Sequence, residues 1–109
     1  MRDFFFDTAN VDFIKSTMDK YGSDINSKWV RGVTTNPNAF SKIDKYHLDE
    51  WLDHAVVMGK LIADIRGDNE GEVHIQAPYS HLDPEVILEY AKMITDATQG
   101  TCKVGMKIP

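Results

Sequence analysis

The chain has 109 residues, of which 42% are hydrophobic and 27% are charged. This composition is typical of one small globular domain and excludes an intrinsically disordered chain. The formal net charge of -5 argues against a nucleic-acid partner, because such proteins need a basic surface that displaces counterions from phosphates. The sequence has neither a membrane-length apolar run nor an apolar leader, and its single cysteine, Cys102, suits a reducing compartment. We therefore expect a cytoplasmic protein with no nucleic-acid or membrane partner.

The first third of the chain alternates short apolar runs with a longer amphipathic segment. The aromatic run 4–6, which ends at an aspartate, predicts a first strand. Asn10 predicts the N-cap of a helix, because apolar residues recur after it at helical spacing. Residues 29–35 predict a second strand, which the Asn36-Pro37 dipeptide closes with a turn.

The same alternation occurs twice more in the rest of the chain. The clearest helix spans 48–65, where apolar residues form one stripe at steps of three and four. A polar loop from Gly67 to Gly71 separates it from a third predicted strand at 73–77. Asp83-Pro84 opens a third helix with a capping residue and a first-turn proline, and 101–108 predicts a fourth strand.

Four strands separated by three helices predict an α/β fold with a parallel sheet of βαβ units. The last strand has no helix after it, which predicts a part of a larger parallel barrel with an open edge. A doubly wound binding module of the flavodoxin type would show the same alternation. That alternative is disfavoured because the sequence has no glycine-rich phosphate loop.

Polar side chains gather on one face of the predicted sheet. Side chains alternate along a strand, so packing the apolar residues against the helices turns Lys107 to the other face, at the carboxyl end of the fourth strand. The same reasoning turns Asp7, Thr34 and Gln76 inward at the ends of their strands, and Asn36 follows the second strand on that side. Barrel active sites are built at these carboxyl ends, and a lysine there is placed to form a Schiff base.

Each of these residues also has an ordinary structural interpretation. Lysine near a strand end is usually solvated, aspartate often caps a turn, and asparagine before proline is a common turn dipeptide. Their coincidence on one face favours chemistry over these separate interpretations. The four histidines (His47, His54, His74 and His81) show no spacing typical of metal ligands, so we expect no metal and no organic cofactor.

Three motifs occur in the same order as in a known enzyme family: F-D-T-A-N at 6–10, G-V-T-T-N-P at 32–37 and M-K-I-P at 106–109. Together they resemble the transaldolase family, most closely its short subgroup, which includes fructose-6-phosphate aldolase and transaldolase-like proteins. The resemblance covers the whole chain and implies the N-terminal half of a TIM (β/α)8 barrel, with four parallel strands and three intervening helices. Residues 1–109 would then form a single partial barrel domain, truncated after strand four.

The resemblance also implies an activity in carbohydrate metabolism, in the pentose phosphate pathway. A Schiff-base (class I) transaldolase or aldolase of this kind acts on a sugar phosphate and transfers or releases a dihydroxyacetone unit. Lys107 would condense with the ketose carbonyl, and Asp7 would take the proton of the C4 hydroxyl as the C3–C4 bond breaks. Asn36 and Thr34 would hold the dihydroxyacetone unit, and Gln76 would position the water used to form and hydrolyse the imine.

Two further expectations concern the context of this site. Gly105 stands where the family usually has a bulky aliphatic residue. The alternative to an active enzyme is a catalytically inactive half-barrel that only folds and self-associates. Open edges at the first and fourth strands, together with exposed barrel-facing surface, predict a homo-oligomer of paired half-barrels.

Overall fold

The computed structural model describes residues 3–76 and 84–107, which form an α/β structure. Its elements in chain order are β1 (Phe4–Asp7), α1 (Val11–Tyr21), the 3-10 helix η1 (Ser27–Trp29), β2 (Val30–Thr34), α2 (Pro37–Ser41), α3 (Leu48–Arg66), β3 (Glu72–Gln76), α4 (Pro84–Ala97) and β4 (Lys103–Lys107). The four strands pair in parallel in the order β1-β2-β3-β4. The α/β class and the single parallel sheet, both predicted from the sequence, are confirmed.

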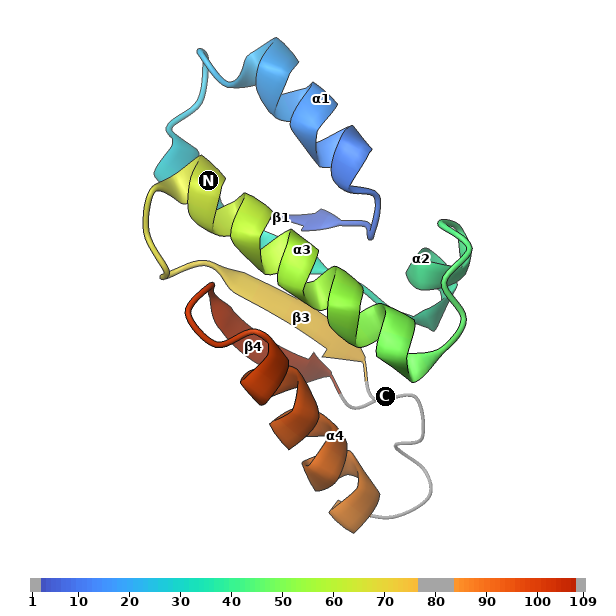
Figure 1. Cartoon of the computed structure of the whole chain (residues 1–109). Helices are drawn as coiled ribbons and strands as arrows, with labels where there is room; N and C mark the ends of the chain where they lie inside the picture. The colour runs from blue at the N-terminus through green and yellow to red at the C-terminus, as the bar shows by residue number, and fades with distance from the viewer. Residues whose placement is uncertain (1–2, 77–83, 108–109) are drawn as a thin grey trace.

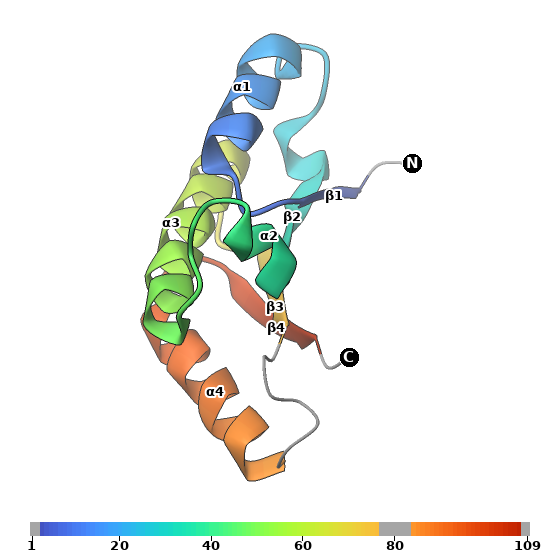
Figure 2. The same ribbon diagram turned by 90° about the vertical axis from the view of Figure 1, so that its right-hand side faces the viewer.

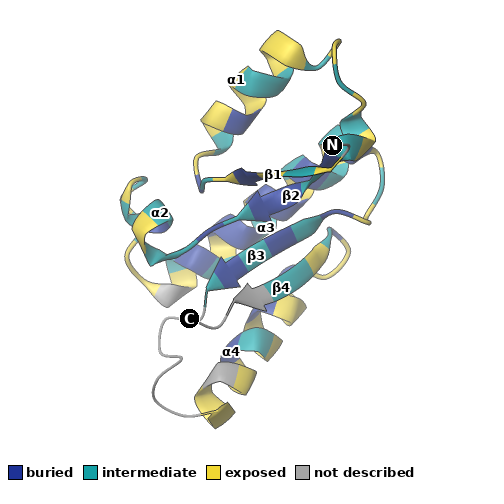
Figure 3. Ribbon diagram, turned by 180° about the vertical axis from the view of Figure 1, so that it is seen from behind, coloured by how far each residue is buried: buried dark blue, intermediate teal, exposed yellow. Residues whose placement is uncertain are grey.

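The three long helices, α1, α3 and α4, lie on the same face of the sheet, with α3 across its centre (Figures 1 and 2). Figure 3 looks onto the opposite face, which no described helix covers and which we call the uncovered face. A doubly wound sheet instead reverses its strand order and carries helices on both faces. The flavodoxin-type alternative therefore does not fit the sequential strand order seen here.

The core lies between the sheet and α3. Phe6 of β1 and Val33 of β2 are buried on the helix-covered face, in register with each other and with Val73 of β3. From α3, the apolar stripe predicted at steps of three and four places Met58 and Ile62 in full burial against them. Each such side chain contributes about 1.5–3 kcal/mol to stability. The packing fixes which side of each strand faces the helices, and so which side chains reach the uncovered face.

The structure differs from the sequence prediction at Asn36-Pro37, where a turn was expected. Asn36 instead caps α2, because its Oδ1 accepts a hydrogen bond from the N–H of Ala39 at 2.7 Å. Pro37 lies in the first turn of α2, where backbone N–H groups have no intrahelical acceptor, so its lack of an N–H costs no hydrogen bond. The connection between β2 and β3 therefore contains α2 as well as α3, and the three predicted intervening helices are accompanied by two short ones, α2 and the 3-10 helix η1.

The remaining boundaries agree with the sequence prediction to within two residues in the described ranges, because local chemistry marks them. Asn10 caps α1 by accepting a hydrogen bond from the N–H of Phe13 at 3.1 Å. Gly67 ends α3 in the left-handed conformation, with φ +73°, which glycine adopts without steric cost. The predicted element ends at Ala77, Asp83 and Ile108 lie outside the described residues.

Across 3–76 and 84–107, none of the helices combines the length and the apolar character needed to span a bilayer.

Candidate functional site

A carboxylate and a hydroxyl meet at the carboxyl ends of the first two strands. Thr34 and Asp7 are register partners, and Oγ1 of Thr34 donates a hydrogen bond to Oδ1 of Asp7 across 2.8 Å. The neighbours of Asp7 and Thr34, Phe6 and Val33, are buried on the helix side, so the pair faces the other way. The Asp7 side chain is exposed, and its second carboxylate oxygen remains for a ligand. The two residues that the sequence placed on one face are therefore in direct contact.

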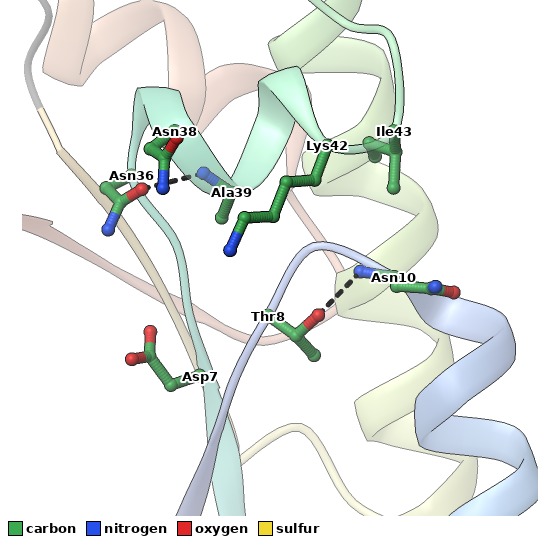
Figure 4. Close-up of a pocket in the computed structure, with 8 residues that line it drawn as sticks. All are labelled: Asp7, Thr8, Asn10, Asn36, Asn38, Ala39, Lys42 and Ile43. Carbon is green, nitrogen blue, oxygen red and sulfur yellow. Dashed lines mark hydrogen bonds between the residues drawn. The ribbon is translucent and has the colours of Figure 1, made fainter.

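Asn36 stands just beyond the end of β2 and has a structural task as well as a candidate functional one. Its carboxamide oxygen caps α2, which holds the side chain in one orientation. Figure 4 shows its amide nitrogen pointing away from the helix, toward the side on which Asp7 lies. The Asn36 amide donor and the Asp7 carboxylate therefore line the same pocket.

A pocket of about 270 Å³ opens between α2 and the β1–α1 connection. Its lining is predominantly polar and consists of Asp7, Thr8, Asn10, Asn36, Asn38, Ala39, Lys42 and Ile43. Figure 4 shows the side chain of Lys42 extending from the end of α2 into this space. The pocket therefore has an acidic wall at the end of β1 and a basic group on the α2 side.

Both walls of the pocket are anchored on α3. His54, which is buried, bonds through Nε2 to the backbone oxygen of Ala9 in the β1–α1 connection. Phe40 of α2 is fully buried, stacks on Trp51 with ring centroids 5.3 Å apart, and meets His54 edge-on. Burial lowers the pKa of His54, so the neutral imidazole donates to the carbonyl. One rigid helix thus positions the two segments that carry the site.

Gln76 and Lys107 occupy the carboxyl ends of β3 and β4, at the same edge of the sheet. Their backbones are register partners, and Gln76 is half-buried. Gln76 is not among the described residues that line the pocket, whose lining includes Asp7 and Asn36 from the predicted site residues. The structure brings Asp7 and Thr34 together, sets Asn36 in the same pocket as Asp7, and aligns the backbones of Gln76 and Lys107 on the other half of the sheet.

Lys42 lines the pocket although it was not among the predicted site residues. The available signal was the Asn36-Pro37 dipeptide, which marks a helix start as well as a turn. Taken as a helix start, it places Ala39 and Lys42 three residues apart, so that they are neighbours on the surface of α2.

Below the strand ends, the uncovered face carries an ionic group. Glu72 of β3 accepts from Nε of Arg31 at 2.8 Å and lies 2.9 Å from Nε2 of His74. The hydrogen bond from His74, aided by Arg31, lowers the pKa of Glu72. The ionisable side chains of this group are therefore paired with one another on the uncovered face.

In the described part of the chain, no three His, Cys, Asp or Glu side chains are close enough together to hold a metal ion.

Comparison with protein-family models, with curated proteins and with solved structures finds no significant match to this chain.

Proposed function

We propose that this chain carries the catalytic strands of a Schiff-base transaldolase or aldolase, which transfers or releases a dihydroxyacetone unit from a ketose phosphate. The observation that supports this most directly is the Thr34–Asp7 hydrogen bond at the edge of the sheet where the ends of β3 and β4 also stand. A base for the C4 hydroxyl and a lysine for the carbonyl are then contributed by one parallel sheet.

The fold that this function needs is the N-terminal half of a TIM (β/α)8 barrel. Sequential parallel strands with all long helices on one face are what half of such a barrel contains, with the uncovered face as its interior. In a flat sheet, three strand spacings would separate β1 from β4 by about 14 Å. Curvature around the uncovered face would shorten the path between Asp7 and Lys107, and the long lysine side chain would span the remainder.

The proposed reaction balances without a cofactor. The neutral amine of Lys107 adds to the C2 carbonyl of the ketose, and, with one proton taken from solvent, water leaves to give an iminium. Asp7 takes the proton of the C4 hydroxyl, the C3–C4 bond breaks, and its electron pair moves into the iminium to give an enamine. C4 departs as the carbonyl carbon of an aldehyde. The enamine then attacks an acceptor aldehyde, whose oxygen takes the proton from Asp7, or is itself protonated. In both cases an iminium results, and water positioned by Gln76 hydrolyses it to release the product and free Lys107.

Asp7 and the amide groups have separable tasks in this reaction. The hydroxyl of Thr34 holds Oδ1 of Asp7, which leaves Oδ2 for the substrate proton. The amide nitrogen of Asn36 would donate to a hydroxyl of the dihydroxyacetone unit. A lysine with the ordinary pKa of about 10.4 is neutral in fewer than about one molecule in a thousand at pH 7, so the mechanism also requires desolvation of Lys107 inside a barrel.

Two variants separate the two chemical steps. Lys107→Arg should abolish the adduct that borohydride traps with fructose 6-phosphate, and with it cleavage. Asp7→Asn should still form the adduct but cleave at least about 100-fold more slowly, because general-base catalysis is lost. Asp12→Asn, at an exposed position in the first turn of α1, is the matched control and should change neither step. Unchanged cleavage by Asp7→Asn would refute the assigned role.

The competing proposal is a catalytically inactive half-barrel that only folds and self-associates. It is favoured by Phe5, which is 39% exposed on the uncovered face, and by the edge positions of β1 and β4 in the sheet. A homo-oligomer of paired half-barrels would cover that surface. Sedimentation of a folded monomer at micromolar concentration would contradict self-association in either proposal.

We also propose a cytoplasmic location, which the single free cysteine, Cys102, supports.

A further inference from the structure

β1 forms one edge of the sheet and presents an acidic row on the uncovered face. Figure 3 shows β1 and β4 at opposite edges of this face, each with a neighbour on one side only among the described strands. Phe4 and Phe6 of β1 pack against the core. The residues that alternate with them are exposed: Asp3, Phe5 and Asp7. The β1 edge therefore carries two carboxylates with an aromatic ring between them.

β4 forms the opposite edge and presents a basic row. Val104 packs against the core, so by alternation positions 103, 105 and 107 of the strand belong to the uncovered face. They are occupied by Lys103, Gly105 and Lys107. The side chain of Lys103 is 61% exposed, although its Nζ also lies 2.8 Å from Glu70. In a chain with a formal net charge of -5, this basic edge is complementary to the acidic edge of β1.

A closed barrel fixes how two such edges would meet. One row of register partners crosses the sheet from β1 to β4: Asp7, Thr34, His74 and Gly105. An eight-stranded barrel displaces the register by about eight residues in one circuit, so each of two identical halves accounts for about four. Gly105 would therefore meet either Asp3 or Val11 of a second copy, and Val11 already begins α1. With Asp3 opposite Gly105, Phe5 of the second copy stands opposite Lys107 in the ladder.

We propose that two copies of this chain pair edge to edge, β4 of each against β1 of the other, and that the pairing completes the site around Lys107. In this register Asp3 of the second copy lies diagonally across the seam from Lys103, within reach of its long side chain. Phe5 of the second copy covers Lys107 and supplies the desolvation that one open sheet does not provide. This inference rests on the proposed function, and adds to it that the second copy contributes a residue to the site.

Single-cysteine variants on a Cys102→Ser background test both the pairing and its register. Phe5→Cys mixed with Lys107→Cys should oxidise to a disulfide-linked dimer, because paired strands lie about 5 Å apart, within the Cα–Cα range of disulfides. Phe5→Cys mixed with Lys103→Cys is the matched control and should not link, because position 103 lies about 13 Å further back along β4. Circular dichroism reports whether each variant is folded. No link in either folded mixture, equal links in both, or a link at position 103 alone would overturn the inference.

Borohydride trapping of the unsubstituted chain with dihydroxyacetone tests whether the pair completes the site. The rate of adduct formation on Lys107 should fall at least about tenfold when dilution separates the copies, because the amine becomes solvated again. An adduct that forms equally fast in separated copies would overturn the contribution of Phe5. A link between positions 5 and 107 without any adduct would support the pairing and overturn the Schiff-base function. An adduct without that link would overturn the pairing alone.

Discussion

The imidazole of His74 lies against the backbone of Gly105 in the neighbouring strand, so a Cβ added at Gly105 would stand 2.7 Å from Cδ2 of the ring. The ring is held there by Glu72, 2.9 Å from its Nε2, and by Phe5, whose ring centroid is 5.1 Å away. Gly105 thus makes room for a histidine on the uncovered face.

This contact predicts that Gly105→Val destabilises the fold by about 1–3 kcal/mol, because the added side chain overlaps the imidazole. Combining it with His74→Ala should cost less than the sum of the two single changes, since the second substitution vacates the space. Urea unfolding of the four proteins in this cycle measures the coupling. Strictly additive losses would show that the histidine and the glycine do not share this space.

Arg66, which is 7% exposed, joins the end of α3 to the start of β2. Its Nη1 donates to the carbonyls of Lys28 at 2.7 Å and Val30 at 2.9 Å, and its Nε donates to Asp68 at 2.9 Å. Arg66→Met keeps the apolar stem but leaves the two carbonyls without these donors. We expect the free energy of unfolding to fall by about 3 kcal/mol.

The matched control for Arg66 is Lys28→Met, which removes an exposed bond to the same carboxylate of Asp68. Exposed ion pairs contribute at most about 1 kcal/mol, so the free energy of unfolding of this variant, measured with urea, should be close to that of the parent. If both variants lost the same free energy of unfolding, the buried hydrogen bonds of the Arg66 guanidinium would not be the source of its contribution to stability.

Tyr90 on α4 is 5% exposed, and its hydroxyl oxygen is buried without a hydrogen-bond partner in the described part of the chain. Burial correspondingly raises the pKa of this phenol. Tyr90→Phe should leave the unfolding free energy unchanged or raise it by up to about 1 kcal/mol, because an unsatisfied polar group is removed. Tyr90→Ala, which opens a cavity, should cost about 3–5 kcal/mol. A clear loss on changing to phenylalanine would reveal a partner for the hydroxyl.

His54 makes the stability depend on pH. Burial holds its pKa below the ordinary value of about 6.5, the charge of Lys45 acts in the same direction, and the bond to the Ala9 carbonyl opposes both. Below pH about 6.5 the unfolded chain therefore binds more protons than the folded chain, and stability that is fully present above this pH is lost as the pH falls.

The variant that checks this is His54→Gln, which retains a donor for the Ala9 carbonyl but does not titrate. Urea unfolding at pH about 7, 6 and 5 should show a shallower decline in the variant than in the parent. Glu72 also has a lowered pKa, so its contribution to stability is lost at more acidic pH. This loss is the same in the parent and in His54→Gln. Identical slopes would assign the decline to other groups.

Much of the fold could be predicted from the sequence because its signals are local and repeated. The stripe on α3, the cap at Asn10 and the glycine at 67 each follow from the chemistry of a few neighbouring residues. The placement of Asp7 and Thr34 on one face could be predicted too, because side chains alternate along each strand, whereas their direct contact depends on the register of β1 against β2.

Other features depend on information that the local sequence does not carry. The helix α2 has five residues, too few to show periodicity, and its starting dipeptide is equally a turn signal. Lys42 was missed for this reason. The contact between His74 and Gly105 depends on the register of β3 against β4, which packing on the helices decides.

We propose that Lys107 forms a Schiff base with a ketose, and borohydride reduction of the chain with dihydroxyacetone, read by intact mass and peptide mapping, tests this proposal. We expect one reduced adduct, located on Lys107 and absent from folded Lys107→Arg. No adduct at saturating dihydroxyacetone on the folded chain, or an adduct on another lysine, would contradict it.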